Sequence, residues 1–183
     1  MTSLATRPFS RTYRAQPVPS TFGFGVRHSG VFWFRGSFSD VVATLHGDTD
    51  EPVLEGSARV DSISVLEPDA LRTHLLGPEF FDAENHPEIR FRSTAMRLGD
   101  DGRAEVDGEL TIRGITRPVA AVGQYATPRQ AAFGEIAGIE LHTILDRREF
   151  GFDWQMQLPG GGDAVSWEVE VDIDLLLIQD AQL

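Results

Sequence analysis

Residues 167–175 alternate strictly between apolar and acidic side chains, and this two-residue period constrains the fold more than any other feature of the chain. One side carries Trp167, Val169, Val171, Ile173 and Leu175, and the other carries Glu168, Glu170, Asp172 and Asp174. Successive side chains of a β-strand point to opposite faces of the sheet. The period therefore predicts a strand with its apolar face on a core and its acidic face in water. Such an acidic face also discourages edge-to-edge association with other strands.

Shorter runs with the same period recur along the chain, separated by glycine, proline and Asp-Gly pairs. Examples lie at residues 22–26, 32–38, 54–60, 89–93 and 106–112. Short alternating runs between turn residues are typical of antiparallel barrels and sandwiches, whereas parallel units need a helix between successive strands. We therefore expect an all-β antiparallel barrel.

One short helix is expected near residues 68–77. Asp69 lies where the helix can begin, leucines recur behind it at helical spacing, and the Gly-Pro pair at 77–78 ends it. Phe80 and Phe81 follow at once, and two large rings beside a short helix are most simply explained as a plug on an apolar interior.

A resemblance to a known family rests on four strings of residues. They are HLLGPEFFDAENHPEIRFRST at 74–94, GELTIRGITRPV at 108–119, DRREFGFDW at 146–154 and VRHSGV at 26–31. These strings resemble, in the expected order, segments of the YceI-like polyisoprenoid-binding family. The chain departs from the family in its opening turn, where Gln16 and Pro19 replace the usual acidic residue and His.

The resemblance implies an eight-stranded antiparallel lipocalin-like barrel that carries the one short helix near residues 68–77. It also implies a single YceI-like domain at residues 13–178, which leaves residues 1–12 as a flexible N-terminal tail. A closed barrel of eight strands has an interior that side chains can fill or that can hold one small or slender ligand.

Cysteine and lysine are both absent from the 183 residues, so all 16 basic residues are arginines. This composition excludes thiol nucleophiles, thiolate metal sites and lysine Schiff bases. A net charge of -12 argues against broad contact with nucleic acid, which requires clustered positive charge. The acidity also disfavours lying flat on an anionic membrane, although a local arginine cluster can still contact lipid headgroups.

Residues 1–12 contain no apolar run of signal-peptide length, and no stretch of the chain approaches the length of a transmembrane helix. We therefore expect a cytoplasmic protein that does not insert stably into a membrane.

The apolar sides of the alternating runs supply the candidates for a ligand-contacting interior. These candidates are Phe22, Phe24, Phe34, Phe38, Gly56, Ala58, Phe91, Leu110, Ile112, Leu141, Val169 and Val171. Two of them, Gly56 and Ala58, are small and leave room inside the barrel. Alternation alone is equally compatible with a filled core, and the resemblance is what favours a hollow tube.

The five histidines are not spaced to place two metal ligands on one helix or strand face, so no metal site is expected. His28 shares a face with Phe24, and a buried His bonded to a backbone carbonyl is a simpler explanation than ligand contact. Arg27, His28 and Arg35 lie near a strand break and are the candidates for contact with a ligand head, because guanidiniums bind phosphate well.

The charged residues at 146–149 permit two interpretations, namely acid-base chemistry at the barrel rim or a structural turn. A turn held by an Asp-Arg pair is the simpler one, since the resemblance assigns this string to a structural corner.

We expect a protein that binds, sequesters or carries a long-chain isoprenoid or related amphiphilic lipid, with no cofactor and no catalytic residues. Two alternatives stay open: an enzyme that acts on a barrel-bound amphiphile through His28 or His74 with a carboxylate, and a filled-core stress or interaction module. Trp33 falls on the outward side of its strand beside Val31, and this pair is a candidate contact patch for a homodimer.

Overall fold

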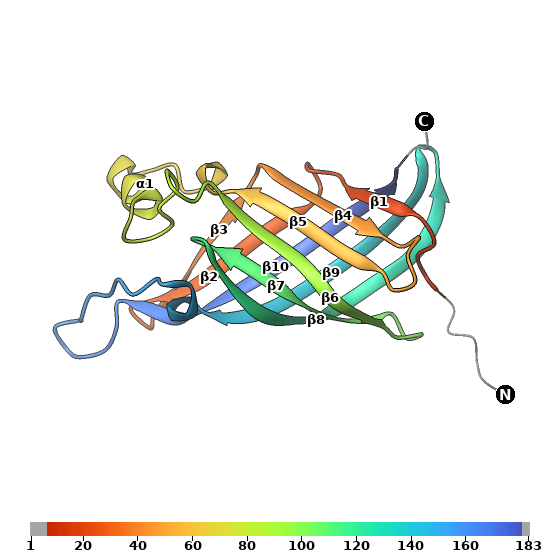
Figure 1. The fold of residues 1–183 in the computed structure, drawn as a ribbon. Helices are drawn as coiled ribbons and strands as arrows, with labels where there is room; N and C mark the ends of the chain where they lie inside the picture. Colours follow the sequence, from red (N-terminus) through yellow and green to blue (C-terminus); the bar gives the residue numbers. More distant parts are fainter. Residues whose placement is uncertain (1–6, 181–183) are drawn as a thin grey trace.

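The computed structural model describes residues 7–180, which form a barrel with a helix at one end (Figure 1). The strands are β1 (Thr12–Ala15), β2 (Thr21–His28), β3 (Phe32–Phe38), β4 (Val41–His46), β5 (Val53–Arg59), β6 (Glu88–Leu98), β7 (Arg103–Ile112), β8 (Ile115–Ala131), β9 (Gly134–Asp146) and β10 (Val165–Gln179). The helix is α1 (Asp69–Leu76), and two 3-10 turns are η1 (Val60–Ser62) and η2 (Arg147–Phe150).

The sheet closes into a barrel because β1 pairs with β4 on one edge and with the end of β10 on the other. The order around the barrel is β1-β4-β5-β6-β7-β8-β9-β10, and the neighbouring strands are antiparallel. The β2–β3 hairpin continues the sheet from the first part of β10. Over residues 7–180, the predicted eight-stranded antiparallel barrel with one short helix is therefore confirmed.

Alternation decides which side chains of β10 turn inward, with one exception. The inward side chains are Val169, Val171, Ile173 and Leu175, as the two-residue period predicts. Trp167 departs from this set because the pairing of β10 with β2 shifts register between Val165 and Val169. Its ring lies instead beneath the guanidiniums of Arg147 and Arg148, at 4.3 Å and 4.9 Å from the ring centroid.

The segment after α1 covers one end of the barrel. The backbone N–H of Phe81 donates to the carbonyl of Leu75 at 3.0 Å, so the chain folds back onto the helix. The rings of Phe80 and Phe81 then lie 6.3 Å and 5.1 Å from the ring of Phe152. As predicted, the two rings pack on the apolar interior of the barrel.

The opposite end of the barrel is filled by a dense apolar cluster. Its largest fully buried members include Phe9, Tyr13, Leu45, Val106, Ile139 and Leu177. The ring of Phe9 packs 5.6 Å from Tyr13 and 5.8 Å from Tyr125. The expected flexible tail at 1–12 is therefore too long, since Phe9 belongs to the core and Thr12 to β1. The rest of that expected tail, residues 1–6, lies outside the described residues.

We expect the stability of the barrel to fall as the pH rises above about 10, and Tyr13 to cause part of this fall. Burial raises the pKa of the Tyr13 phenol, and its hydrogen bond to Glu135 and the charge of that residue raise it further. Above pH 10 the unfolded chain loses a proton that the folded chain keeps. The free energy of unfolding then decreases with pH, by at most about 1.4 kcal/mol per pH unit for one group.

Urea unfolding between about pH 9 and pH 11 measures this slope in the parent, in Tyr13→Phe and in Tyr125→Phe. The Tyr13→Phe variant is expected to show a flatter decline. Burial also raises the pKa of Tyr125, so Tyr125→Phe removes that separate contribution and keeps the one from Tyr13. Equal slopes for the parent and Tyr13→Phe would contradict the assignment.

Candidate ligand-binding cavity

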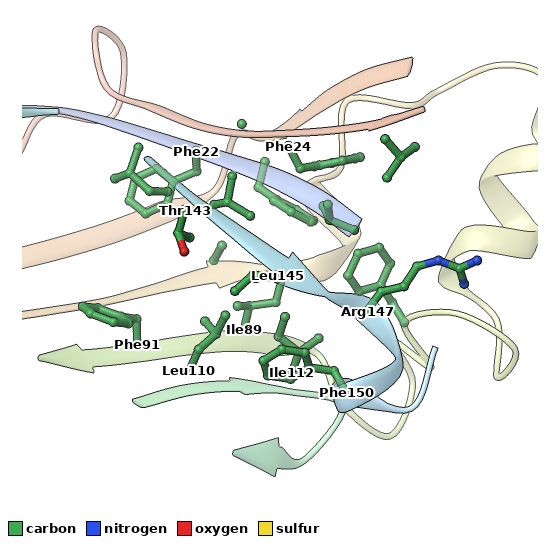
Figure 2. A pocket seen from close by; sticks show the side chains of 18 of the residues that line it. Phe22, Phe24, Ile89, Phe91, Leu110, Ile112, Thr143, Leu145, Arg147 and Phe150 are labelled. Atoms are coloured by element: carbon green, nitrogen blue, oxygen red, sulfur yellow. The ribbon is translucent and has the colours of Figure 1, made fainter. Parts of the chain in front are cut away.

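An apolar cavity of about 500 Å³ occupies the half of the barrel next to α1. All of the residues predicted to line the interior border it: Phe22, Phe24, Phe34, Phe38, Gly56, Ala58, Phe91, Leu110, Ile112, Leu141, Val169 and Val171. Figure 2 shows several of these side chains directed toward one another around the open space. The barrel thus combines a filled end with a hollow end, so the filled-core alternative describes only half of the interior. That these residues contact a ligand stays a prediction.

Glycines keep the cavity open by letting aromatic rings lie flat against its wall. A Cβ atom at Gly36 would come within 2.4 Å of the Phe24 ring, which belongs to the paired residue on β2. A Cβ atom at Gly108 would come within 2.5 Å of the Phe91 ring. Because each ring occupies the space above a glycine, it does not project across the lumen. The sequence shows that glycines and phenylalanines alternate along these strands. Only the register of the sheet shows which phenylalanine ring lies over which glycine.

Polar groups beside the cavity are few and are engaged with the protein itself. The Thr143 hydroxyl donates to the Ala120 carbonyl at 2.7 Å, and Nδ1 of His142 lies 2.7 Å from the Asp172 carboxylate. A polar ligand group buried among the aliphatic and aromatic side chains would therefore lose its hydrogen bonds to water. The middle of the cavity suits an apolar chain.

His74 forms part of the cover over the cavity. Its ring lies 4.9 Å from the ring of Phe80 and 5.2 Å from the ring of Trp154, edge to face in both cases. Its Nδ1 atom is 3.4 Å from the carboxylate of Glu79. His74 thus lies next to a carboxylate, whereas Nδ1 of His28 contacts the hydroxyl of Ser29 at 3.1 Å. Within residues 7–180, no three His, Asp or Glu side chains are grouped to hold a metal ion.

The Asp-Arg turn at η2 anchors the rim of the cavity. Asp146 accepts hydrogen bonds from the backbone N–H and the Nε atom of Arg148, at 3.0 Å and 2.9 Å. The hydrogen bond from the Arg148 side chain lowers the pKa of Asp146. The structural turn expected from the sequence is therefore present. Arg148 itself is exposed.

Arg147 has a structural role at this corner that the sequence did not distinguish from that of its neighbour. Its side chain is buried and donates to the backbone carbonyls of Phe152, Trp154 and Ser166 at 3.0 Å, 2.9 Å and 2.9 Å. Burial lowers the pKa of its guanidinium. In Figure 2 this guanidinium points away from the phenylalanine rings of the cavity. Arg147 therefore borders the cavity, while its guanidinium holds the rim segments together.

The cavity reaches the surface at Phe32, which lines it and is 51% exposed. Phe32 and Phe34 line it from β3, and Leu71 and His74 line it from α1. Among the described residues, β3 pairs with β2 only, and its last residues contact the segment that follows η1. Within the described part of the chain, the outer edge of β3 thus has no strand partner where its side chains line the cavity.

The candidates for head-group contact lie on two different faces of the β2–β3 hairpin. His28 borders the cavity. Arg27 and Arg35 lie on the outer face, where their guanidiniums are 4.7 Å and 5.3 Å from the centroid of the Trp33 ring. A ligand head inside the cavity would therefore meet His28 and not the arginines. Trp33 is half-buried beneath these guanidiniums, and the homodimer expected from it stays a prediction.

Comparison with known proteins identifies the family. The model of the YceI-like domain matches residues 13–177. The chain belongs to this family. A UPF0312 protein of Pseudomonas putida (strain W619) is 28% identical over 153 residues, which cover 82% of this chain and 76% of the relative.

Two solved structures share the YceI-like fold. BcnA of Burkholderia cenocepacia matches with a TM-score of 0.70 and 19% identity, over 88% of this chain and 98% of that protein. A domain from Saccharophagus degradans matches with a TM-score of 0.65 and 11% identity, over 92% and 98% of the two chains. That domain is described as polyisoprenoid-binding and as implicated in plant cell wall breakdown. Separately, no helix within residues 7–180 has the length and apolar character needed to cross a bilayer.

Proposed function

We propose that this YceI-like protein binds and carries a long-chain isoprenoid or a related amphiphilic lipid, without converting it chemically. The observation that carries the proposal is the apolar cavity of about 500 Å³ inside the barrel. Ligand pockets for drug-sized molecules measure about 300–1,000 Å³, so the cavity has room for a chain of several isoprene units. The description of the Saccharophagus degradans domain as polyisoprenoid-binding supports the same class of ligand.

The physical basis of binding is the removal of an apolar tail from water. Each buried methylene contributes about 0.8 kcal/mol, so a branched hydrocarbon chain is held tightly with few polar contacts. The branched methyl groups of an isoprenoid suit the irregular wall of rings and glycines formed by Phe24, Gly36, Phe91 and Gly108. The head of the ligand would then lie at the opening, near His28 and His74.

We expect affinity to increase with the number of isoprene units until the tail fills the cavity. Geraniol, farnesol and geranylgeraniol differ by one isoprene unit each and share the same alcohol head. Each added unit is expected to tighten binding at least about tenfold while it fits, and binding should show a negative heat-capacity change. Isothermal titration calorimetry measures both quantities, and native mass spectrometry shows whether the purified protein already holds such a chain.

Triethylene glycol, a flexible polar chain, is the control ligand and is expected not to bind. Failure of all three alcohols to bind, together with the absence of any apolar ligand in native mass spectra, would overturn the proposal.

A further inference from the structure

Three loops at the end of the barrel that carries α1 and the mouth of the cavity, here called the open end, expose apolar side chains. Val31, Leu66 and Met156 are 79%, 63% and 54% exposed. They belong to the β2–β3 turn, the segment before α1 and the loop between η2 and β10, and Figure 1 shows these segments at the same end of the barrel. A backbone hydrogen bond joins two of the loops, since the N–H of Ser29 donates to the carbonyl of Ala164 at 2.7 Å. Within the second loop, the N–H of Ala164 donates to the carbonyl of Met156 at 2.9 Å.

The β2–β3 hairpin carries its side chains in a definite order from the tip to the stem. Val31 and Phe32 form the apolar tip, and both are exposed. The next residue, Trp33, is paired with Arg27, and its ring lies 4.7 Å from that guanidinium. Arg35 follows two residues later on β3, and its guanidinium lies 5.3 Å from the centroid of the same ring. Along β3 the order is therefore apolar, then aromatic, then cationic, and Arg27 of β2 lies level with Trp33.

This order matches the layers of a lipid bilayer seen from its centre outward. A strand rises about 3.3 Å per residue, so Arg35 lies about 10 Å from Phe32 along the hairpin. Peripheral segments bury their apolar side about 5–10 Å into the boundary between acyl chains and headgroups. Trp is enriched at that boundary, and arginine binds the phosphate oxygens just outside it. The three layers of the hairpin thus fall at the depths where each residue type is stable.

We propose that the open end of this protein docks on the surface of a phospholipid bilayer, with the β2–β3 tip and the Met156 loop in the interface. Arg27 and Arg35 contact lipid phosphates in this arrangement. The net charge of -12 opposes docking on strongly anionic membranes. Charges more than about 10 Å from the surface are screened at physiological salt, so the charges at this end decide the local interaction. They are of both signs, because Arg35 lies 3.8 Å from Glu170 and Asp163 belongs to the Met156 loop. The bilayer that fits is therefore a zwitterionic one.

Docking at this end would give the cavity a direct route to the membrane. Phe32 belongs to the docked tip and also lines the cavity, so an apolar tail could pass from the bilayer into the cavity without crossing bulk water. This use of the docked state rests on the proposed carrier function, whereas docking itself is measured without any isoprenoid.

Vesicle flotation with phosphatidylcholine tests the proposal on the full chain. The test variant, Val31→Asp/Met156→Asp, changes two exposed side chains that do not border the cavity. The matched control, Val18→Asp/Phe133→Asp, adds the same charge at positions that are 97% and 86% exposed and lie toward the other end of β10. The test variant is expected to lose at least about tenfold in vesicle partitioning, and the control to stay within about twofold of the parent.

Calorimetry with geranylgeraniol and light scattering complete the test. If the test variant loses flotation but still binds geranylgeraniol, the result supports docking by the exposed loops as a property separate from ligand binding in the cavity. Absence of parent flotation while geranylgeraniol still binds overturns docking and leaves the carrier function intact. Equal losses of flotation in the test and control variants also overturn docking. A smaller mass of the test variant by light scattering overturns it too, because Val31 and Met156 would then contact a second copy of the chain.

Discussion

Replacing Arg147 with Ala is expected to lower the free energy of unfolding by about 3 kcal/mol or more. Arg147 is 5% exposed and its guanidinium donates to four backbone carbonyls, so its removal leaves buried acceptors without a charged donor. Hydrogen bonds to a charged group contribute about 1.5–3 kcal/mol each, and they are not additive because water can replace some of them. Urea unfolding of the parent and the variant measures the difference.

Arg148→Ala is the matched control for this experiment. Arg148 is the next residue, stacks on the same Trp167 ring and pairs with Asp146, but its side chain is exposed. Its removal is expected to leave the unfolding midpoint close to that of the parent, since exposed ion pairs contribute little. Arg147→Lys keeps the charge without the planar fork and should fall between the two. Similar effects of Arg147→Ala and Arg148→Ala would show that burial at this corner does not matter.

Loss of Arg147 should also weaken ligand binding by a separate route. Its acceptors include the carbonyls of Phe152 and Trp154, whose side chains line the cavity cover beside His74 and Phe80. Without the donor, this rim segment has fewer contacts that hold it over the cavity. The residue therefore acts as a positioning group for the cover, and ligand affinity should fall even under conditions where the variant stays folded.

The fold and the lining of the cavity could be predicted from the sequence because both depend on a two-residue period. Each run that alternates, such as those around Phe24, Phe91 and Val169, has only one way to bury its apolar face. The predictions fail where local geometry interrupts the period. The irregular pairing at the start of β10 moves Trp167 out of the interior, and no short-range pattern marks Phe9 as part of the core.

The roles of charged residues were harder to predict, because the sequence does not show which face of a strand break is inside. Arg27 and His28 are neighbours, yet they lie on opposite faces of β2 and only His28 borders the cavity. Arg147 and Arg148 are also neighbours, and one is buried while the other is exposed. In both cases a shift of one residue in register would exchange the two side chains between the interior and the solvent. Tertiary contacts set that register.

The hollow end of the barrel also depends on a few small residues. A larger side chain at the inner end of the cavity, called its floor, would fill part of the space. The floor is where the cavity meets the filled end, and Ala43, Leu54, Leu141 and Leu175 belong to both the lining and the core cluster. Ala121 of β8 borders the cavity at this floor and packs against the same cluster. A larger side chain here would shorten the space available to a ligand tail and would leave the opening unchanged.

Ala121→Trp is therefore expected to weaken binding of geranylgeraniol by at least about tenfold, or about 1.4 kcal/mol, and to affect the shorter geraniol much less. Ala120→Trp provides the matched control, because Ala120 is the preceding residue, carries the same side chain and is exposed on the outer face of β8. Calorimetry on the two variants compares the same substitution on the two faces of one strand. A loss that is equal for both alcohols would indicate a disturbed barrel instead of a shortened cavity, and unchanged affinity in Ala121→Trp would mean that the tail does not reach the floor.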